Sequence, residues 1–311
     1  MIGVMNGKKS AKFHIFKNKN IRRNFWDSML FLSPSLVVFT VFIFIPIAMA
    51  FYLSLMKWDL LTADRQFVGL KNYIYYLTNP FFYKVLLNTV YFAAAHIPLD
   101  LIITLGLALL LNQKLKGLSF YRTIYFIPVI SSMVAVSAVW IWIYEPESGG
   151  LANYVLGLFG ISPLGWLHDP HWAMPAIILV SVWKGLGYNI VIFLAGLQNI
   201  PDIYYEAARI DGANAWQQFR RVTLPLLSPI TYFVILMGII NSFKVFTQIE
   251  VMTPEGGPLN STTVLNLYLY QEAFHKYRFG RASALAFIMF AIILIITKIQ
   301  RSVSHKNVHY E

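Results

Sequence analysis

The sequence predicts an all-α, polytopic membrane protein with six transmembrane helices. Of its 311 residues, 57% are hydrophobic and 13% are charged, whereas soluble domains are about 45–50% apolar and about 25% charged. The apolar residues form long uninterrupted blocks, and a helix needs about 20 such residues to cross the hydrocarbon core of a membrane. The chain has no cysteine, which excludes disulfides, thiolate-bound metals and thiol nucleophiles.

Six segments are apolar enough to be transmembrane helices. They are residues 29–56, 85–111, 124–144, 172–197, 226–249 and 282–297. The last is short, but Arg281 and Lys298 beside it can extend their charged groups to the headgroups. With six spans, both termini lie on the same side of the membrane.

Lysine and arginine counts predict which side that is. Sixteen of these residues lie in the two termini and in the loops after spans two and four: Lys8, Lys9, Lys12, Lys17, Lys19, Arg22, Arg23, Lys114, Lys116, Arg122, Arg209, Arg220, Arg221, Lys298, Arg301 and Lys306. The opposite side has seven: Lys57, Arg65, Lys71, Lys84, Lys276, Arg278 and Arg281. Because cytoplasmic loops carry the excess of positive charge, both termini are predicted to be cytoplasmic.

The loop after the fourth predicted span has a helix–turn–helix pattern. Pro201-Asp202 suits the first turn of a helix, and Asp211-Gly212 predicts a turn because glycine reaches the left-handed region without strain. Asn214 and Gln217 have the spacing of a capping box. The pattern suits a surface that docks into a groove of a partner, and the alternative is a packed surface loop.

These residues resemble the EAA loop of ABC importer permeases. The motif consists of Glu206-Ala207-Ala208, then Asp211-Gly212-Ala213, and finally Thr223-Leu224-Pro225. Residues 30–300 as a whole are similar to the carbohydrate-uptake branch of that family, which includes the maltose and glycerol-phosphate importer permeases. The other stretches that carry the resemblance are Asn88-Thr89, Phe120 to Thr123 with Pro128, Trp183, Ala195 to Pro201, Met252 to Pro258, Ser261-Thr262 and Tyr270 to Phe274.

The resemblance implies a type I ABC importer permease fold and a non-catalytic subunit. The EAA loop of such permeases is a coupling helix that sits in a cleft of a cytoplasmic ATPase. The residues of this chain that would carry the coupling are Glu206, Ala207, Ala208, Asp211, Gly212, Ala213 and Phe219. The implied partners are a second, related permease, two ATPase subunits that bind ATP and magnesium, an extracytoplasmic substrate-binding protein and a sugar or oligosaccharide. The chain would bind no cofactor and no nucleic acid, and it would lie in the bacterial cytoplasmic membrane.

The predicted organisation follows from the spans and the resemblance. Residues 1–28 are a basic cytoplasmic tail, and residues 29–83 are the first transmembrane helix with its outer loop. Residues 84–300 are the permease core, with five helices and the EAA loop at 199–225. Residues 301–311 are a cytoplasmic tail.

Few polar residues lie within the predicted spans, and charged groups at membrane depth are costly enough to indicate function. The candidates for a substrate pathway are Asp100, Lys184, Tyr188, Asn189, Asn241, Phe243, Lys244, Phe246 and Gln248, accompanied by His96. Aromatic faces and hydrogen-bonding groups together suit a sugar. The alternative is that Asp100 and Lys184 only pair to hold two helices together. The two lysines also suggest an anionic glycan, such as a uronate-bearing oligosaccharide.

The sequence offers three further interpretations. His168, Asp169 and His171 lie close together in sequence, but they lack a third convergent metal ligand, and no metal site is predicted. A self-sufficient secondary transporter or channel is the alternative function, and such proteins contain inverted repeats with broken helices in matching positions. The sequence shows no inverted repeat of this kind. A membrane scaffold protein is a third class of function.

Overall fold

The computed structural model describes residues 19–59, 65–113, 117–146 and 149–304. Contacts divide the chain into two compact units, residues 1–53 and residues 54–311. The predicted tails at 1–28 and 301–311 therefore lie mostly outside the described residues.

The first unit is one long apolar helix where it is described. It comprises α1 (Lys19–Phe39), the π-helical turn η2 (Thr40–Phe44) and α2, which runs from Ile45 to Ser54. The π-turn ends two residues before Pro46, which has no N–H to bond the carbonyl of Phe42. Residues 24–54 could cross a membrane by length and composition, and the most apolar stretch among them is not buried within the chain. This helix therefore presents its apolar side chains to lipid or to another protein.

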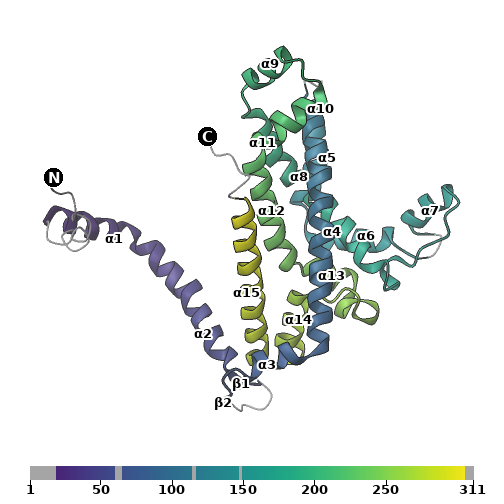
Figure 1. Ribbon diagram of the computed structural model, residues 1–311. Helices are drawn as coiled ribbons and strands as arrows, with labels where there is room; N and C mark the ends of the chain where they lie inside the picture. The colour runs from purple at the N-terminus through teal and green to yellow at the C-terminus, as the bar shows by residue number, and fades with distance from the viewer. Residues whose placement is uncertain (1–18, 60–64, 114–116, 147–148, 305–311) are drawn as a thin grey trace, which may run out of the picture. The chain divides into compact units, whose positions relative to one another are not determined.

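The second unit is a bundle of long helices with short elements at both ends (Figure 1). Its long elements are α4 (Pro80–Leu111), α5 (Leu118–Ile130), α6 (Met133–Ile143), α8 (Ala173–Gln198), α12 (Ser228–Phe243) and α15 (Phe279–Ser304). At the lower end in Figure 1 lie α3 (Lys71–Thr78) and the antiparallel strands β1 (Met56–Trp58) and β2 (Arg65–Phe67). At the upper end lie α9 (Asp202–Ile210) and α10 (Ala215–Gln218).

The remaining elements are short and connect the long helices. They are α7 (Leu151–Leu158), η3 (Trp166–His168), η4 (Phe219–Thr223), α11 (Leu224–Leu226), α13 (Thr247–Met252), η5 (Pro254–Gly256), η6 (Pro258–Asn260), α14 (Leu265–Tyr270) and η7 (Gln271–His275).

In the part of the chain that the structure describes, four helices are long and apolar enough to cross a membrane, and there are up to six spans if each of two bent pairs counts as one. The predicted fourth and sixth spans are confirmed as helices. The sixth is longer than predicted, because α15 begins at Phe279, and 24 of its residues are suitable for spanning. The segments predicted at 124–144 and 226–249 are helical, but neither is a single continuous helix, and the prediction is wrong on that point.

The third predicted span is two helices. It breaks between α5 and α6 with a bend of 108°, because Ser131 and Ser132 adopt extended backbone angles. Pro128 weakens the end of α5, since it has no N–H, and the Ser131 hydroxyl donates to the Ile127 carbonyl oxygen at 2.9 Å. The fifth span ends at Phe243 rather than 249, and α13 begins separately at Thr247.

The helices α4, α5, α8 and α12 form the centre of the second unit. The helix α4 packs against α8 and α12, and α5 packs against α8. Gly187 of α8 allows the last of these contacts, because a Cβ there would lie 2.2 Å from the carbonyl oxygen of Tyr125 in α5. Gly187 is therefore a helix-packing glycine.

Candidate functional site

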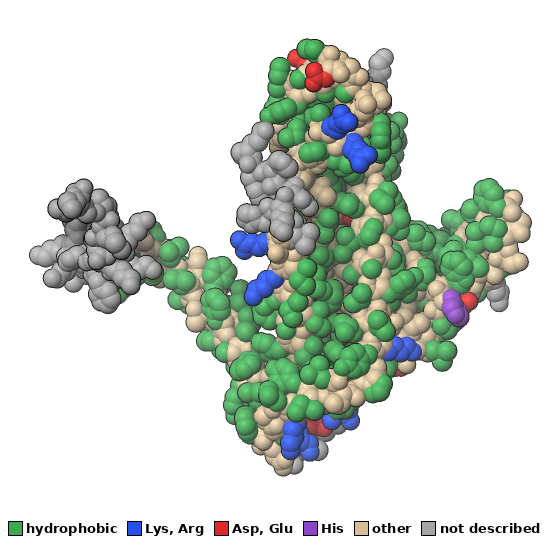
Figure 2. Space-filling model, in the orientation of Figure 1, with side chains coloured by type: hydrophobic (Ala, Val, Ile, Leu, Met, Phe, Trp, Pro, Cys, Tyr) green, Lys and Arg blue, Asp and Glu red, His purple; other side chains and the backbone are tan. Residues whose placement is uncertain are grey.

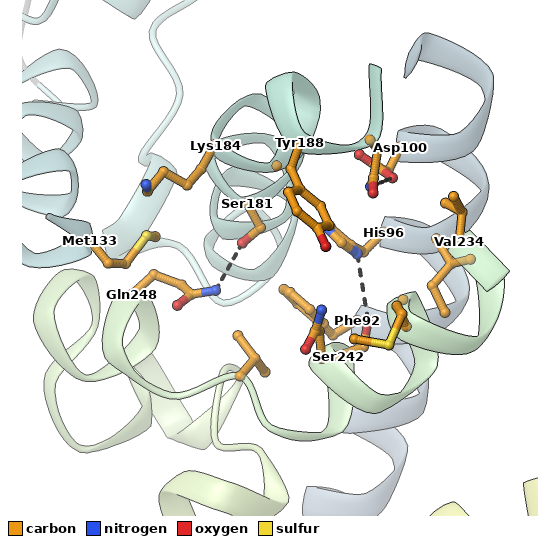
Figure 3. Close-up of a pocket in the computed structure, with 17 residues that line it drawn as sticks. Phe92, His96, Asp100, Met133, Ser181, Lys184, Tyr188, Val234, Ser242 and Gln248 are labelled. Carbon is orange, nitrogen blue, oxygen red and sulfur yellow. Dashed lines mark hydrogen bonds between the residues drawn. The ribbon is translucent and has the colours of Figure 1, made fainter. Parts of the chain in front are cut away.

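A cavity of about 220 Å³ lies between the central helices. Figure 3 shows its labelled side chains converging from α4, α6, α8, α12 and α13. The residues from α4 and α8 come from the middle of those helices, far from both ends of the bundle. The cavity therefore lies at the depth where membrane transporters hold their substrates.

Asp100 provides the carboxylate of the cavity. The side chain is buried, with 4% of its surface exposed. Its Oδ2 accepts a hydrogen bond of 2.7 Å from the Asn189 amide of α8, whereas its Oδ1 is buried without a hydrogen-bond partner among the described residues. Gly185, which also lines the cavity, leaves space beside that oxygen, since a Cβ at Gly185 would lie 3.7 Å from it.

Lys184 does not pair with Asp100. Among the described residues, its ammonium donates to the carbonyl oxygens of Pro128 and Val129, at 2.5 Å and 2.9 Å. These carbonyls belong to the last turn of α5, where the intrahelical bonding ends. Lys184 is thus a cation at the C-terminus of a helix, where the helix dipole favours positive charge. The ion-pair alternative is wrong for this lysine.

Weaker hydrogen bonds join the remaining walls of the cavity. The Gln248 amide donates to the Ser181 hydroxyl at 3.2 Å, and the Ser242 hydroxyl lies 3.5 Å from Nδ1 of His96 (Figure 3). Phe92 stacks on the His96 ring, with 5.3 Å between the ring centroids. The cavity thus combines aromatic faces with hydroxyl and amide groups.

The structure brings six of the nine predicted pathway residues to this cavity. They are Asp100, Lys184, Tyr188, Asn189, Asn241 and Gln248. The other three are placed elsewhere: Phe243 is buried in a separate apolar cluster, Lys244 is exposed, and Phe246 packs on Tyr270 with centroids 4.8 Å apart. The helix α12 ends at Phe243, so Lys244 and Phe246 no longer follow the face on which a continuous helix would place them.

Several cavity residues carried no signal in the sequence. Ser181, Ser242, Met133 and Phe92 line the cavity, but serine, methionine and phenylalanine are ordinary in membrane helices. Ser181 lies three residues before Lys184 and seven before Tyr188, which is the spacing of one helix face. This spacing was the only sequence signal that Ser181 shares a helix face with Lys184 and Tyr188.

The loop at 199–225 has the predicted helix–turn–helix structure. The helix α9 ends in a Schellman motif, in which the Ala213 N–H bonds the Ala208 carbonyl and the Gly212 N–H bonds the Arg209 carbonyl. Gly212 has φ +77°, in the left-handed region. The predicted capping box of α10 is confirmed, because Asn214 and Gln217 exchange hydrogen bonds of 2.8 Å and 2.9 Å.

This loop presents an exposed surface at the end of the bundle (Figure 1). Glu206, Ala207, Asp211 and Gly212 are exposed, whereas Ala208, Ala213 and Phe219 are half-buried. Apolar side chains are also exposed there: 87% of Ile210 and 66% of Trp216 are accessible. Trp216 packs on Phe219, with centroids 5.5 Å apart. Exposed apolar side chains next to small residues are typical of a docking surface.

The histidine cluster before α8 has a local structural role. The Asp169 carboxylate accepts hydrogen bonds from the backbone N–H and the ring of His171 at 2.8 Å and 3.2 Å. The backbone hydrogen bond is the main reason why the pKa of Asp169 is lowered. Within the described ranges, no three His, Cys, Asp or Glu side chains are placed to hold a metal ion.

A cavity in the middle of a bundle of apolar helices, with an exposed helix–turn–helix loop at one end, is typical of a membrane transport protein. Comparison with known proteins identifies the kind. The family model for the inner membrane component of binding-protein-dependent transport systems matches residues 15–308, and the chain belongs to this family. Homologous members are transporter permease subunits.

Curated relatives match over nearly the whole chain. The probable ABC transporter permease protein YesP of Bacillus subtilis is 38% identical over 299 residues, which cover 95% of this chain and 96% of that protein. The arabinooligosaccharides transport system permease protein AraP of Bacillus subtilis is 35% identical and covers 88% of this chain and 87% of its own length.

A solved structure has the same fold. A chain in the crystal structure of a bacterial ABC transporter that imports the acidic polysaccharide alginate aligns with a TM-score of 0.78 and 23% identity. The alignment covers 93% of this chain and 98% of that chain. The fold is therefore that of an ABC importer permease.

Proposed function

We propose that this chain is the permease subunit of an ATP-driven sugar or oligosaccharide importer in the bacterial cytoplasmic membrane. It crosses the membrane six times, with both termini in the cytoplasm. It works with a second, related permease, two ATPase subunits and an extracytoplasmic binding protein. ATP and magnesium are bound, and ATP is hydrolysed, by the ATPase subunits.

The loop at 199–225 would transmit movement of an ATPase to the central helices. Its contact residues would be those of the motif together with one aromatic side chain, and they are Glu206, Ala207, Ala208, Asp211, Gly212, Ala213 and Phe219. The exposed Ile210 and Trp216 side chains supply apolar contact area. Two features support the docking role, namely the fixed geometry of the Schellman motif and the capping box, and the exposure of the surface they hold.

The cavity would be the substrate site of this subunit. The observation that carries this proposal is the buried Asp100 carboxylate, whose Oδ1 has no partner among the described residues while Oδ2 is held by Asn189. An unpaired buried carboxylate oxygen costs free energy that a donated hydrogen bond recovers. Sugars present several hydroxyl donors, and the adjacent aromatic rings can cover an apolar sugar face.

We expect Asp100→Asn to lower sugar uptake by about 10- to 100-fold, the value of one hydrogen bond to a charged group. The substitution keeps the shape of the side chain and an acceptor for the Asn189 amide. Uptake of radiolabelled sugar by cells that carry the complete importer measures the effect. The matched control is Lys244→Gln, which changes a charge outside the cavity and should leave uptake unchanged. Unchanged uptake by Asp100→Asn would refute the assignment.

We further propose that the part of the sugar held in this cavity is uncharged. Lys244, one of the two lysines that suggested an anionic glycan, does not line the cavity, and the ammonium of Lys184 is engaged by two backbone carbonyls. The Asp100 carboxylate lines the same cavity and would repel an acidic sugar.

The charge of the sugar can be tested with Lys184→Gln. Glutamine can still donate to one of the two carbonyls, so we expect uptake to fall only a few-fold, and by the same factor for neutral and uronate-bearing oligosaccharides. A selective loss of the acidic oligosaccharides would instead support an anionic substrate. Competition uptake assays with paired neutral and acidic sugars give this ratio directly.

A further inference from the structure

We infer that the chain binds the phosphate group of an anionic phospholipid in a second cavity, at the end of the bundle opposite the 199–225 loop. This cavity has a volume of about 310 Å³. Its charged lining residues are Lys57, Lys71, Arg278, Arg281 and Asp59. Figure 2 shows Lys and Arg side chains gathered at the lower end, where α3 and β1 lie in Figure 1.

The β1–β2 hairpin, the neighbouring helix α3 and the start of α15, which is distant in sequence, build this second cavity. The hairpin of β1 and β2 is attached to α3 by the Asn72 amide, which donates to the carbonyls of Ser54 and Met56 at 2.8 Å and 2.9 Å. The start of α15 packs against both α3 and β1. The hairpin and the two helix starts therefore hold the lysines and arginines around one space.

Among the described residues, the lining has four cations and one carboxylate, so positive charge is in excess there. Arg281 lies in the first turn of the 26-residue helix α15, where the helix dipole disfavours positive charge. Its guanidinium is 4.0 Å from the centroid of the Tyr75 ring, which holds it at the cavity. An anion between these groups would relieve both the mutual repulsion and the unfavourable dipole.

The apolar surface beside the cavity favours a lipid over a soluble anion. Leu70, Ile74 and Leu77 are exposed and lie at helical spacing along α3. Lys71 and Tyr75, one position further along the same helix, line the cavity. A helix with an exposed apolar stripe beside a basic cavity suits the boundary between acyl chains and headgroups. In the orientation proposed above, this is the outer leaflet.

Native mass spectrometry of the full-length chain in detergent tests this inference, with added phosphatidylglycerol, phosphatidylcholine or inorganic phosphate. We expect phosphatidylglycerol to bind more tightly than phosphatidylcholine. The double variant Lys71→Gln/Arg278→Gln should weaken phosphatidylglycerol binding by about tenfold or more and leave phosphatidylcholine binding unchanged. Both side chains are exposed, so the substitutions should not disturb folding, and elution as a single monodisperse species confirms this.

Two matched variants separate the cavity from general charge effects. Lys71→Arg/Arg278→Lys keeps both charges and should retain phosphatidylglycerol binding. Arg220→Gln/Arg221→Gln removes two charges at the other end of the bundle and should also retain it. An equal loss in this last variant, or no loss in Lys71→Gln/Arg278→Gln, overturns the inference. Displacement of phosphatidylglycerol by an equal concentration of inorganic phosphate would instead indicate a site for soluble phosphate.

Discussion

Replacement of Gly212 by proline should reduce substrate uptake by about 100-fold or more while the membrane helices stay folded. Proline is restricted to φ near −65°, whereas Gly212 has φ +77°, and proline also removes the N–H that bonds the Arg209 carbonyl. The cost of about 3 kcal/mol or more falls on the turn between α9 and α10, which lies outside the central bundle. Transport assays with the complete importer measure the loss.

Gly212→Asn is the matched control, because asparagine tolerates the left-handed conformation at the end of a helix. This variant should retain most of the uptake. Since the chain has no native cysteine, Ala213→Cys introduces a single reactive thiol in the loop. A short thiol crosslinker in native membranes should capture an ATPase subunit, and the capture should disappear in the Gly212→Pro background. Labelling from the cytoplasm without any captured ATPase would favour the secondary-transporter alternative.

Replacement of Gly187 by alanine should destabilise the protein by about 3 kcal/mol, near the upper end of the usual range for overpacking. The added Cβ would lie 2.2 Å from the Tyr125 carbonyl oxygen and 2.7 Å from a Val129 methyl group. The first of these is a backbone atom, so α5 and α8 must separate to accommodate it. The midpoint of thermal unfolding of the purified protein in detergent measures the effect.

Gly106→Ala is the matched control, because it makes the same substitution at another helical glycine. Gly106 lies in the long helix α4, and a Cβ there would have nothing within 4 Å. Alanine is about 1 kcal/mol more favourable than glycine inside a helix, so this variant should be neutral or slightly more stable. Equal midpoints for the two alanine variants would contradict the close-packing role of Gly187.

The 199–225 loop was largely predictable from the sequence because its structure depends on local chemistry. The Asp211-Gly212 pair, the spacing of Asn214 and Gln217, and the run of small residues each determine a turn, a cap or a close approach within a few residues of themselves. No distant contact is needed to form these elements. The apolar blocks predicted the presence of membrane-spanning helices for the same reason, since hydrocarbon requires every backbone group to be bonded locally.

The cavity depended on tertiary structure. The sequence indicated that certain polar residues lie in the predicted spans. The Asp100–Asn189 hydrogen bond, however, joins residues 89 positions apart, and no pattern of neighbouring residues predicts that hydrogen bond. The break between α5 and α6 leaves carbonyl groups at the end of α5 without intrahelical partners, and Lys184 donates hydrogen bonds to two of them. Lys184 therefore caps a helix and does not pair with Asp100.

The sequence by itself therefore determined the class of protein, the apolar helices and the docking loop. Only the tertiary structure decided which intramembrane polar groups face one another and which of the candidate pathway residues, such as Phe243 and Lys244, lie outside the cavity. The physical reason is that helix formation and turns are governed by neighbours along the chain. The direction in which a side chain points after a bend depends instead on the packing of helices that are distant in sequence.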